Sequence, residues 1–236
     1  AQSMADAVKS SGVKCQIGHH LRASEPVRKL KQMIRDGSAG RPLLMQARWF
    51  CNPLYGDWWR DPEIGGGQLI EQAIHIYDLT RYFFGDVDVV TGFRGNLGHA
   101  RFPQYRVDDT SASTIRFRNG AIASVCASNA AEPCAWSVCA TVIFEKVVVD
   151  LATPERATFV YHDGKVSDEV WRDNIKIPRE EVANTVNAHE QITRNFIAAV
   201  RGEEEMLSSI DDGLEGLRLV RAVARSSDED GMPQRL

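Results

Sequence analysis

The sequence lacks an apolar run long enough to span a membrane, and its first ten residues lack the apolar core of a signal peptide. It also lacks an excess of basic charge. The 28 Lys and Arg residues are scattered and are balanced by 32 Asp and Glu, for a net charge of -4. These absences argue against a membrane protein and against a protein that binds nucleic acid or an anionic membrane. We therefore expect a cytoplasmic protein with neither kind of partner.

Paired cysteines are also lacking. The chain has five cysteines, an odd number, and none of them forms a CxxC pair. This pattern suits reduced thiols in the cytosol better than a disulfide framework. A single cysteine in a strand usually serves as a small buried apolar residue, so we assign these thiols no chemistry.

What is present is a globular composition with clear helical periodicity. The chain has 236 residues, of which 43% are hydrophobic and 25% are charged, enough for a sizeable buried core. Apolar residues recur at helical spacing in five segments. The predicted helices are residues 2–10, 24–36, 65–84, 185–201 and 210–225.

Between the third and fourth helices the pattern changes to strands. Predicted strands are residues 13–18, 43–50, 87–93, 110–117, 121–128, 136–151 and 157–166. Asn119-Gly120 and Asp163-Gly164 are typical of hairpin turns. Helices, then consecutive strands, then helices indicate an α+β fold, with one large, mainly antiparallel sheet and helices on one face.

The other face of such a sheet requires a cover. Apolar residues on both faces are predicted for the strands that hold Val138, Thr141, Ile143, Val147 and Val149. A second copy of the chain would bury the uncovered face, so we expect a homodimer or a tetramer formed through it.

Residues 1–20 do not fit this domain. A helix followed by a short apolar strand resembles the end of a doubly wound nucleotide-binding domain, whereas residues 21–236 form the α+β unit. The phosphate-binding GxGxxG turn of such a domain is absent, because the glycines at 65–67 follow a loop. We therefore interpret the chain as the second half of a longer protein, with no dinucleotide bound to this half alone.

The glycines at 65–67 open a helix that carries two polar residues. Glycine leaves the backbone N–H groups bare, so a polar ligand or another backbone can approach closely. Glu71 and His75 lie four residues apart and therefore project from one helix face. A histidine with a carboxylate neighbour is suited to proton transfer near neutral pH.

WWRDPEIGGGQLIEQAIHIYDLTRYFFGD, residues 58–86, resembles the signature of the Gfo/Idh/MocA oxidoreductases, the glucose-fructose oxidoreductase and inositol dehydrogenase family. That signature has a Trp-Arg pair, three glycines, a carboxylate, a His four residues later and an Asp three beyond. The resemblance extends over nearly the whole chain, through residues 17–22, 25–49, 110–125 and 195–227.

The resemblance implies a C-terminal α/β domain that covers an NAD or NADP held by an N-terminal Rossmann domain. It implies a sugar, inositol or related polyol as substrate. By resemblance, His75 takes the hydroxyl proton while hydride leaves the same carbon. The implied substrate-binding residues are Glu71, Asn52, His20, Arg22 and Trp59.

Two departures from the family are visible. The catalytic Lys of the family's Glu-Lys-Pro motif lies before the first helix of this chain and is absent. Glu71 stands where the inositol dehydrogenase branch usually has Asp, which leaves the substrate open.

Other interpretations compete. Glu71 and His75 can be a surface pair, Asp78 can line the pocket or pair with Arg81 or Arg60, and Trp58 and Trp59 can stack on a sugar or pin their loop. A non-catalytic binding or assembly module is the second candidate function. A metal-dependent lyase or isomerase is the third, with His19 or His20 joining Glu71 and His75, although adjacent strand residues point to opposite faces. We expect no metal site and assign no role to His99, His162 and His189.

Overall fold

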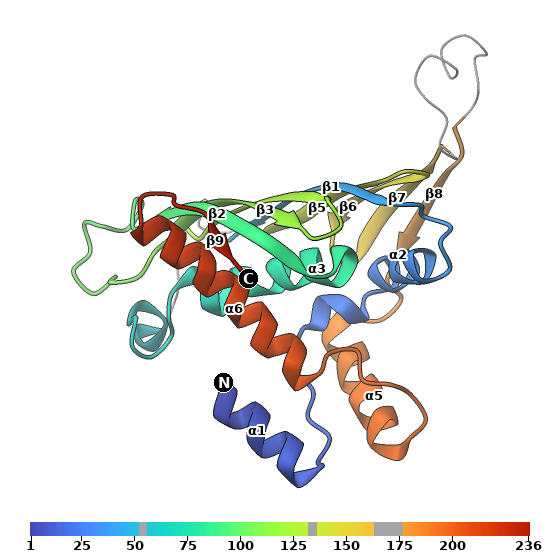
Figure 1. Cartoon of the computed structure of the whole chain (residues 1–236), viewed down its shortest axis with the longest axis horizontal. Coiled ribbons are helices and arrows are strands. Elements are labelled where there is room, and N and C mark those ends of the chain that lie inside the picture. Colours follow the sequence, from blue (N-terminus) through green and yellow to red (C-terminus); the bar gives the residue numbers. More distant parts are fainter. Residues whose placement is uncertain (52–55, 132–135, 163–176) are drawn as a thin grey trace.

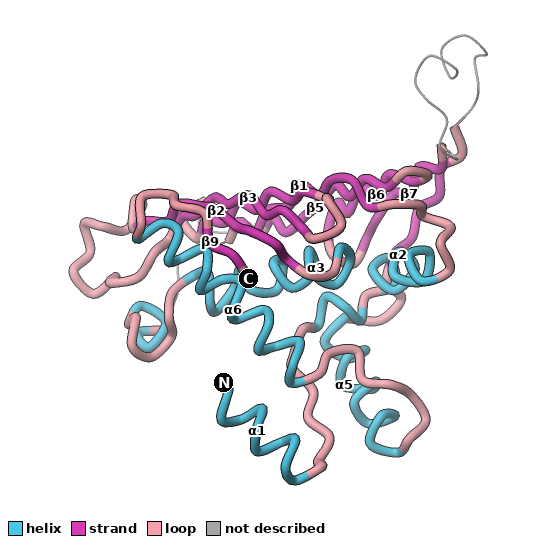
Figure 2. Tube along the Cα trace, viewed as in Figure 1, coloured by secondary structure: helices cyan, strands magenta, loops and turns pink. Residues whose placement is uncertain are grey.

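The computed structural model describes residues 1–51, 56–131, 136–162 and 177–236. These residues form a two-layer structure, with a large sheet on one side and the helices on the other (Figure 1). The same separation is visible when the chain is coloured by secondary structure (Figure 2). The prediction of an α+β fold with helices on one face of a large sheet is confirmed.

The sheet has nine strands in the order β8-β7-β6-β5-β1-β4-β3-β2-β9. Their bounds are β1 Pro42–Phe50, β2 Val87–Gly95, β3 Thr110–Phe117, β4 Ile122–Ser128, β5 Ser137–Phe144, β6 Val147–Thr153, β7 Arg156–Tyr161, β8 Arg179–Ala183 and β9 Gln234–Arg235. Among the described strand pairs, β1 and β4 are parallel and the others are antiparallel. The sheet is therefore mainly antiparallel.

The helices lie beneath one face of the sheet (Figure 1). Their bounds are α1 Gln2–Ser11, α2 Glu25–Arg35, α3 Ile74–Phe84, α5 Ala188–Arg201 and α6 Ile210–Asp228, with 3₁₀ turns η1 His20–Ala23 and η2 Asp57–Arg60 and a π-helical turn η3 Leu69–Ala73. None of the helices in the described part of the chain is both long enough and apolar enough to cross a bilayer.

The core lies between α3 and the sheet. Tyr77, Phe117 and Phe144 are fully buried there. Phe84, at the end of α3, makes edge-to-face contacts with Phe117 and Phe144 at centroid distances of 5.3 and 5.6 Å. Because this apolar side of α3 is fixed by burial, the position of His75 near the start of the helix is fixed as well.

The opposite face of the sheet carries an apolar row. Leu44 of β1 is the Cα partner of Ile122 in β4 and of Ile143 in β5, and Ile143 in turn pairs with Val148 of β6. Paired residues in a sheet point to the same face, and Leu44 and Ile122 are exposed. No helix lies over this face in the described structure (Figure 1).

Two predicted strands differ in the structure. Residues 13–18 form only an isolated bridge between Gln16 and Ser209, because the segment has no neighbouring strand among the described residues with which to form a ladder. Residues 136–151 form the hairpin of β5 and β6 rather than one strand. At this turn Glu145 and Lys146 donate backbone hydrogen bonds to Arg41 and Ala39. The predicted turn at Asp163-Gly164 lies outside the described residues.

Candidate functional site

The three glycines before α3 allow close approach by the chain's own backbone. A Cβ at Gly65 would lie 2.7 Å from the Trp58 carbonyl oxygen and 2.9 Å from the Cα of Trp59. Gly66 and Gly67 have φ angles of 75° and 83°, which other residues rarely adopt. A Cβ at Gly67 would also lie 2.7 Å from Oδ1 of Asp108. The glycines therefore let η2 and the loop before β3 pack against the helix start.

After the glycines the chain begins with a π-helical turn, η3, before continuing as α3. Single π turns of this kind occur frequently at functional sites because they widen the helix locally. Glu71 lies within η3, and His75 is the second residue of α3. Both side chains line the same pocket, so the prediction that they project together agrees with the geometry.

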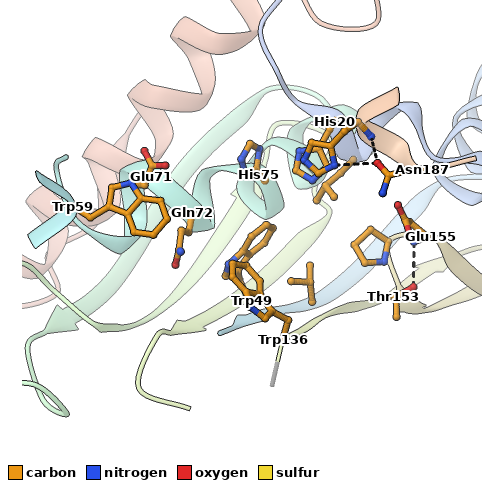
Figure 3. Close-up of a pocket in the computed structure, with 14 residues that line it drawn as sticks. His20, Trp49, Trp59, Glu71, Gln72, His75, Trp136, Thr153, Glu155 and Asn187 are labelled. Atoms are coloured by element: carbon orange, nitrogen blue, oxygen red, sulfur yellow. Dashed lines mark hydrogen bonds between the residues drawn. The ribbon is translucent and has the colours of Figure 1, made fainter. Parts of the chain in front are cut away.

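The pocket has a volume of about 520 Å³, within the range of small-molecule sites. It lies where the start of α3, the β6–β7 turn, the start of α5 and η1 meet (Figure 3). Its lining residues are His20, Leu21, Trp49, Trp59, Glu71, Gln72, His75, Trp136, Val138, Thr153, Pro154, Glu155, Asn187 and His189.

His75 lies at the centre of this group (Figure 3). Its Nδ1 is buried and has no hydrogen-bond partner in the described structure. Its ring centroid lies 4.8 Å from that of His20 and 5.6 Å from the Trp49 ring. Burial, and then the neighbouring His20, His19 and His189, lower the pKa of His75 to about 3. The expectation of titration near neutral pH therefore differs from the structure, in which burial outweighs any nearby carboxylate.

Glu71 projects beside Trp59 at one end of the pocket (Figure 3). Burial raises the pKa of the Glu71 carboxyl above its ordinary value. Trp59 itself packs against Tyr105 and Val107. Trp59 therefore anchors its loop, as one interpretation expected, and it also lines the pocket. Trp58 is exposed and does not belong to the lining.

The opposite wall consists of residues that the sequence did not indicate. The His189 ring stacks on His20 at 4.0 Å with an interplanar angle of 16°. Asn187 accepts a hydrogen bond from the His189 backbone N–H at 2.8 Å and so caps α5. Glu155 accepts one from the Ala188 N–H at 3.1 Å. Asn187 and Glu155 come from polar loop positions with no motif and His189 is the second residue of α5, so only the fold brings these side chains beside His20.

Aromatic rings form a third side of the pocket. Trp49, on β1, and Trp136 meet edge to face at a centroid distance of 6.1 Å. Trp49 is almost fully buried, whereas Trp136 is exposed. Aromatic faces of this kind can pack against the C–H face of a sugar ring, and they can equally pack against other apolar ligands.

Arg22, which the resemblance implied as a substrate-binding residue, does not line the pocket. It is 3% exposed and forms two hydrogen bonds to the fully buried Asp78, at 2.8 and 2.6 Å. A further bond joins it to Asp212. Asp78 therefore pairs with Arg22 rather than with Arg81 or Arg60. Asn52, the other implied pocket residue, lies outside the described residues.

A metal site is not apparent in residues 1–51, 56–131, 136–162 and 177–236, where no group of three or more His, Cys, Asp and Glu residues is placed to hold an ion. His20, Glu71 and His75 line one pocket without forming such a group. His19 points to a different neighbour, since its Nε2 lies 3.6 Å from Oδ1 of Asp78.

Comparison with known proteins places the chain among oxidoreductases. Residues 27–149 match the family model described as the GFO/IDH/MocA C-terminal domain. The uncharacterized oxidoreductase YrbE of Bacillus subtilis is 26% identical over 236 residues, covering 96% of this chain and 64% of YrbE. The scyllo-inositol 2-dehydrogenase (NAD(+)) of the same organism is 28% identical over 137 residues, covering 54% of this chain and 37% of that protein.

The fold is that of a solved relative. The structure of levoglucosan dehydrogenase in complex with NADH and levoglucosan superposes with a TM-score of 0.83 at 19% identity, covering 99% of this chain and 69% of that one. The chain spans less than two thirds of the length of the two Bacillus relatives. Each of these relatives thus contains a substantial part to which this chain does not correspond.

Proposed function

This chain belongs to the GFO/IDH/MocA family of oxidoreductases, and from that premise we propose that it supplies the substrate-binding, His75-bearing part of an NAD(P)-dependent enzyme. The substrate would be a sugar, an inositol or a related polyol, oxidised or formed at one hydroxyl-bearing carbon. The observation that carries the proposal is the buried, unpartnered Nδ1 of His75 in a pocket that also contains Glu71.

His75 would act as the proton acceptor for the reacting hydroxyl. Its low pKa keeps the imidazole neutral, so a nitrogen lone pair is free to accept a proton at neutral pH. A nicotinamide dinucleotide would supply the acceptor for the hydride that leaves the hydroxyl-bearing carbon. As that hydride leaves, the O–H bond becomes strongly acidic, so even a weak base suffices to take the proton and leave a carbonyl.

Glu71 and the aromatic wall would hold the ring. The Glu71 carboxylate can accept hydrogen bonds from one or two sugar hydroxyls, which fixes the reacting carbon relative to His75. Trp49, Trp59 and Trp136 offer apolar surface to the ring's C–H groups. His20 and Asn187 provide further polar contacts at the opposite side.

The dinucleotide would be held by residues other than 1–236. The relatives extend beyond the part that this chain matches, and the chain contains no GxGxxG turn. Calorimetric titration of residues 1–236 with NADH should show no binding at micromolar concentrations. Tight binding would refute this part of the proposal.

Replacement of His75 tests the central role. In the enzyme that includes the dinucleotide-binding part, His75→Ala should lower turnover of a sugar or polyol substrate by roughly two to four orders of magnitude. This is the usual contribution of positioned acid-base catalysis. Affinity for the dinucleotide, measured by fluorescence titration, should change little. His162→Ala is the matched control, because His162 does not line the pocket. Near-normal turnover in His75→Ala would remove the assignment.

We also propose that a second copy covers the open sheet face. The row formed by Ile122, Leu44, Ile143 and Val148 crosses four strands on a face without helices. Apolar rows of this kind are usually buried by a partner, and a twofold interface would place the same row of each copy against the other.

A further inference from the structure

The charged side chains of the pocket share one sign. Glu71 and Glu155 line it, whereas no Lys or Arg does so among the described residues. Two of the lining histidines, His20 and His75, do not offset this charge, because burial keeps both neutral at neutral pH. Burial, followed by the neighbouring His189, lowers the pKa of His20 to about 4, and that of His75 is lower still. The described lining therefore holds two carboxyl groups and no lysine or arginine to pair with them.

The two carboxylates lie at opposite ends of the pocket (Figure 3). Glu71 projects from η3, beside Trp59, whereas Glu155 projects from the turn between β6 and β7. The backbone N–H of Ala188 bonds Oε1 of Glu155 at 3.1 Å, so this side chain is held in place. A ligand that fills the space between the two ends meets a carboxylate at each of them.

Two arginines that lie next to lining residues in η1 and β1 do not face a ligand in the pocket. Arg22 is buried and bonded to Asp78. Arg48 alternates with the pocket residue Trp49 along β1, so it points to the opposite face of the sheet, where it bonds Ser137. An anionic group on the ligand would therefore face like charge without a counter-ion from the described lining.

We propose that the part of the pocket formed by residues 1–236 favours an uncharged or amine-bearing sugar or polyol over one that carries a carboxylate or phosphate, with Glu155 as a specificity-determining residue. The inference rests on the proposed function, since it narrows the substrate class of the same site. A neutral ring satisfies both carboxylates by donating hydroxyl hydrogen bonds. An amine adds a charge-assisted bond, whereas an anion is repelled and leaves its own charge unpaired.

Three sugars with the same ring but different charge test the proposal. Residues 1–236 would be titrated with D-glucose, D-glucosamine and D-glucuronate, with binding followed by ligand-observed NMR at millimolar concentrations. D-Glucosamine should bind at least as tightly as D-glucose, and D-glucuronate at least about tenfold more weakly. The difference in affinity between D-glucose and D-glucuronate should become smaller at high salt, because salt screens the interaction between exposed charges. Binding of D-glucuronate as tight as that of D-glucose would overturn the inference.

The variant Glu155→Gln tests whether Glu155 causes the weaker binding of D-glucuronate. Glutamine keeps a carbonyl oxygen for the Ala188 N–H but removes the charge, so binding of D-glucuronate relative to D-glucose should rise by about tenfold. Glu181→Gln, at an exposed position on β8, is the matched control and should leave the ratio unchanged. An unchanged ratio in Glu155→Gln would reject Glu155 as the determinant.

The outcomes separate this inference from the function on which it rests. Binding of all three sugars without charge preference removes the inference and leaves the sugar site intact. Failure of all three to bind, under conditions where the folded state is confirmed by circular dichroism, contradicts both.

Discussion

His75 and His20 are neutral at neutral pH because burial disfavours their charged forms. The folded-state pKa is about 3 for His75 and about 4 for His20, whereas the unfolded value is 6.5. The unfolded chain therefore binds more protons below pH 6.5, and stability should fall as pH decreases from 6.5 toward 4. The expected loss by pH 5 is about 2 kcal/mol for each of the two histidines. Urea denaturation at a series of pH values measures this slope.

His75→Gln should make that slope shallower. Without the titrating imidazole, the loss of unfolding free energy between pH 6.5 and pH 5 should be smaller by about 2 kcal/mol. His162→Gln, at a position outside the pocket, should retain the full slope. The same slope in His75→Gln and wild type would mean that His75 is not buried as the structure places it.

The sequence predicted part of the site and missed the rest for a physical reason. Glu71 and His75 lie on one helical segment, so their spacing alone places them together. Glu155, in a turn, and His189, at the start of α5, lie far from His75 in the chain, and spacing carries no information about which distant segments converge. Arg22 shows the opposite case, because a lone Arg in a sequence does not reveal that a buried Asp78 takes up its hydrogen bonds.

At the scale of elements, the start of α3 depends on its glycines. Gly67 has a φ of 83°, and Gly67→Ala would place a Cβ 2.7 Å from Oδ1 of Asp108. This oxygen accepts a hydrogen bond from Arg94, which limits its movement. Gly37→Ala is a matched control, since Gly37 has a φ of 78° and an added Cβ there would meet no atom within 4 Å. We expect Gly37→Ala to cost about 1 to 2 kcal/mol of unfolding free energy, from backbone conformation alone. Gly67→Ala should cost roughly 1 to 3 kcal/mol more.

Calorimetry or urea denaturation of the two variants measures that difference. Ligand-observed NMR should also show weaker sugar binding in Gly67→Ala, because a shifted helix start moves Glu71. Equal destabilisation by the two substitutions would show that the loop does not pack against Gly67.

Elements with a strong period or a specific turn residue were predictable. The turn at Asn119-Gly120 joins β3 to β4 as expected, with Gly120 at a φ of 90°. The turn at Glu145 and Lys146 was not predictable, since neither residue is typical of a hairpin turn. The turn forms because the loop between α2 and β1 is placed to accept hydrogen bonds from the backbone N–H groups of Glu145 and Lys146. The segment 13–18 has the apolar character of a strand but lacks a partner along its length.

For the whole molecule, the open sheet face is the surface through which we propose that two copies associate. Leu44 and Ile122, which are partners in the apolar row, are 40% and 44% exposed in the single chain. Light scattering should therefore give at least a dimer. Leu44→Lys should convert it to a monomer, because a buried lysine would leave an unpaired charge in the interface. Leu97→Lys is the control, since Leu97 is 75% exposed in a loop. A monomeric wild type at high concentration would contradict the proposal.

The position of β1 has a consequence for the folding pathway. Strands β2 to β4 form one antiparallel unit of neighbours in the sequence, and β5 to β8 form another, but β1 lies between β4 and β5 and joins them. Its Leu44 pairs with Ile122 and Ile143, so both contacts close long loops and have high contact order. During synthesis β1 emerges before either partner and must wait unpaired. The two units can form early from local contacts, whereas the continuous sheet, and with it the wall that holds Trp49 beside His75, is completed only when β1 inserts.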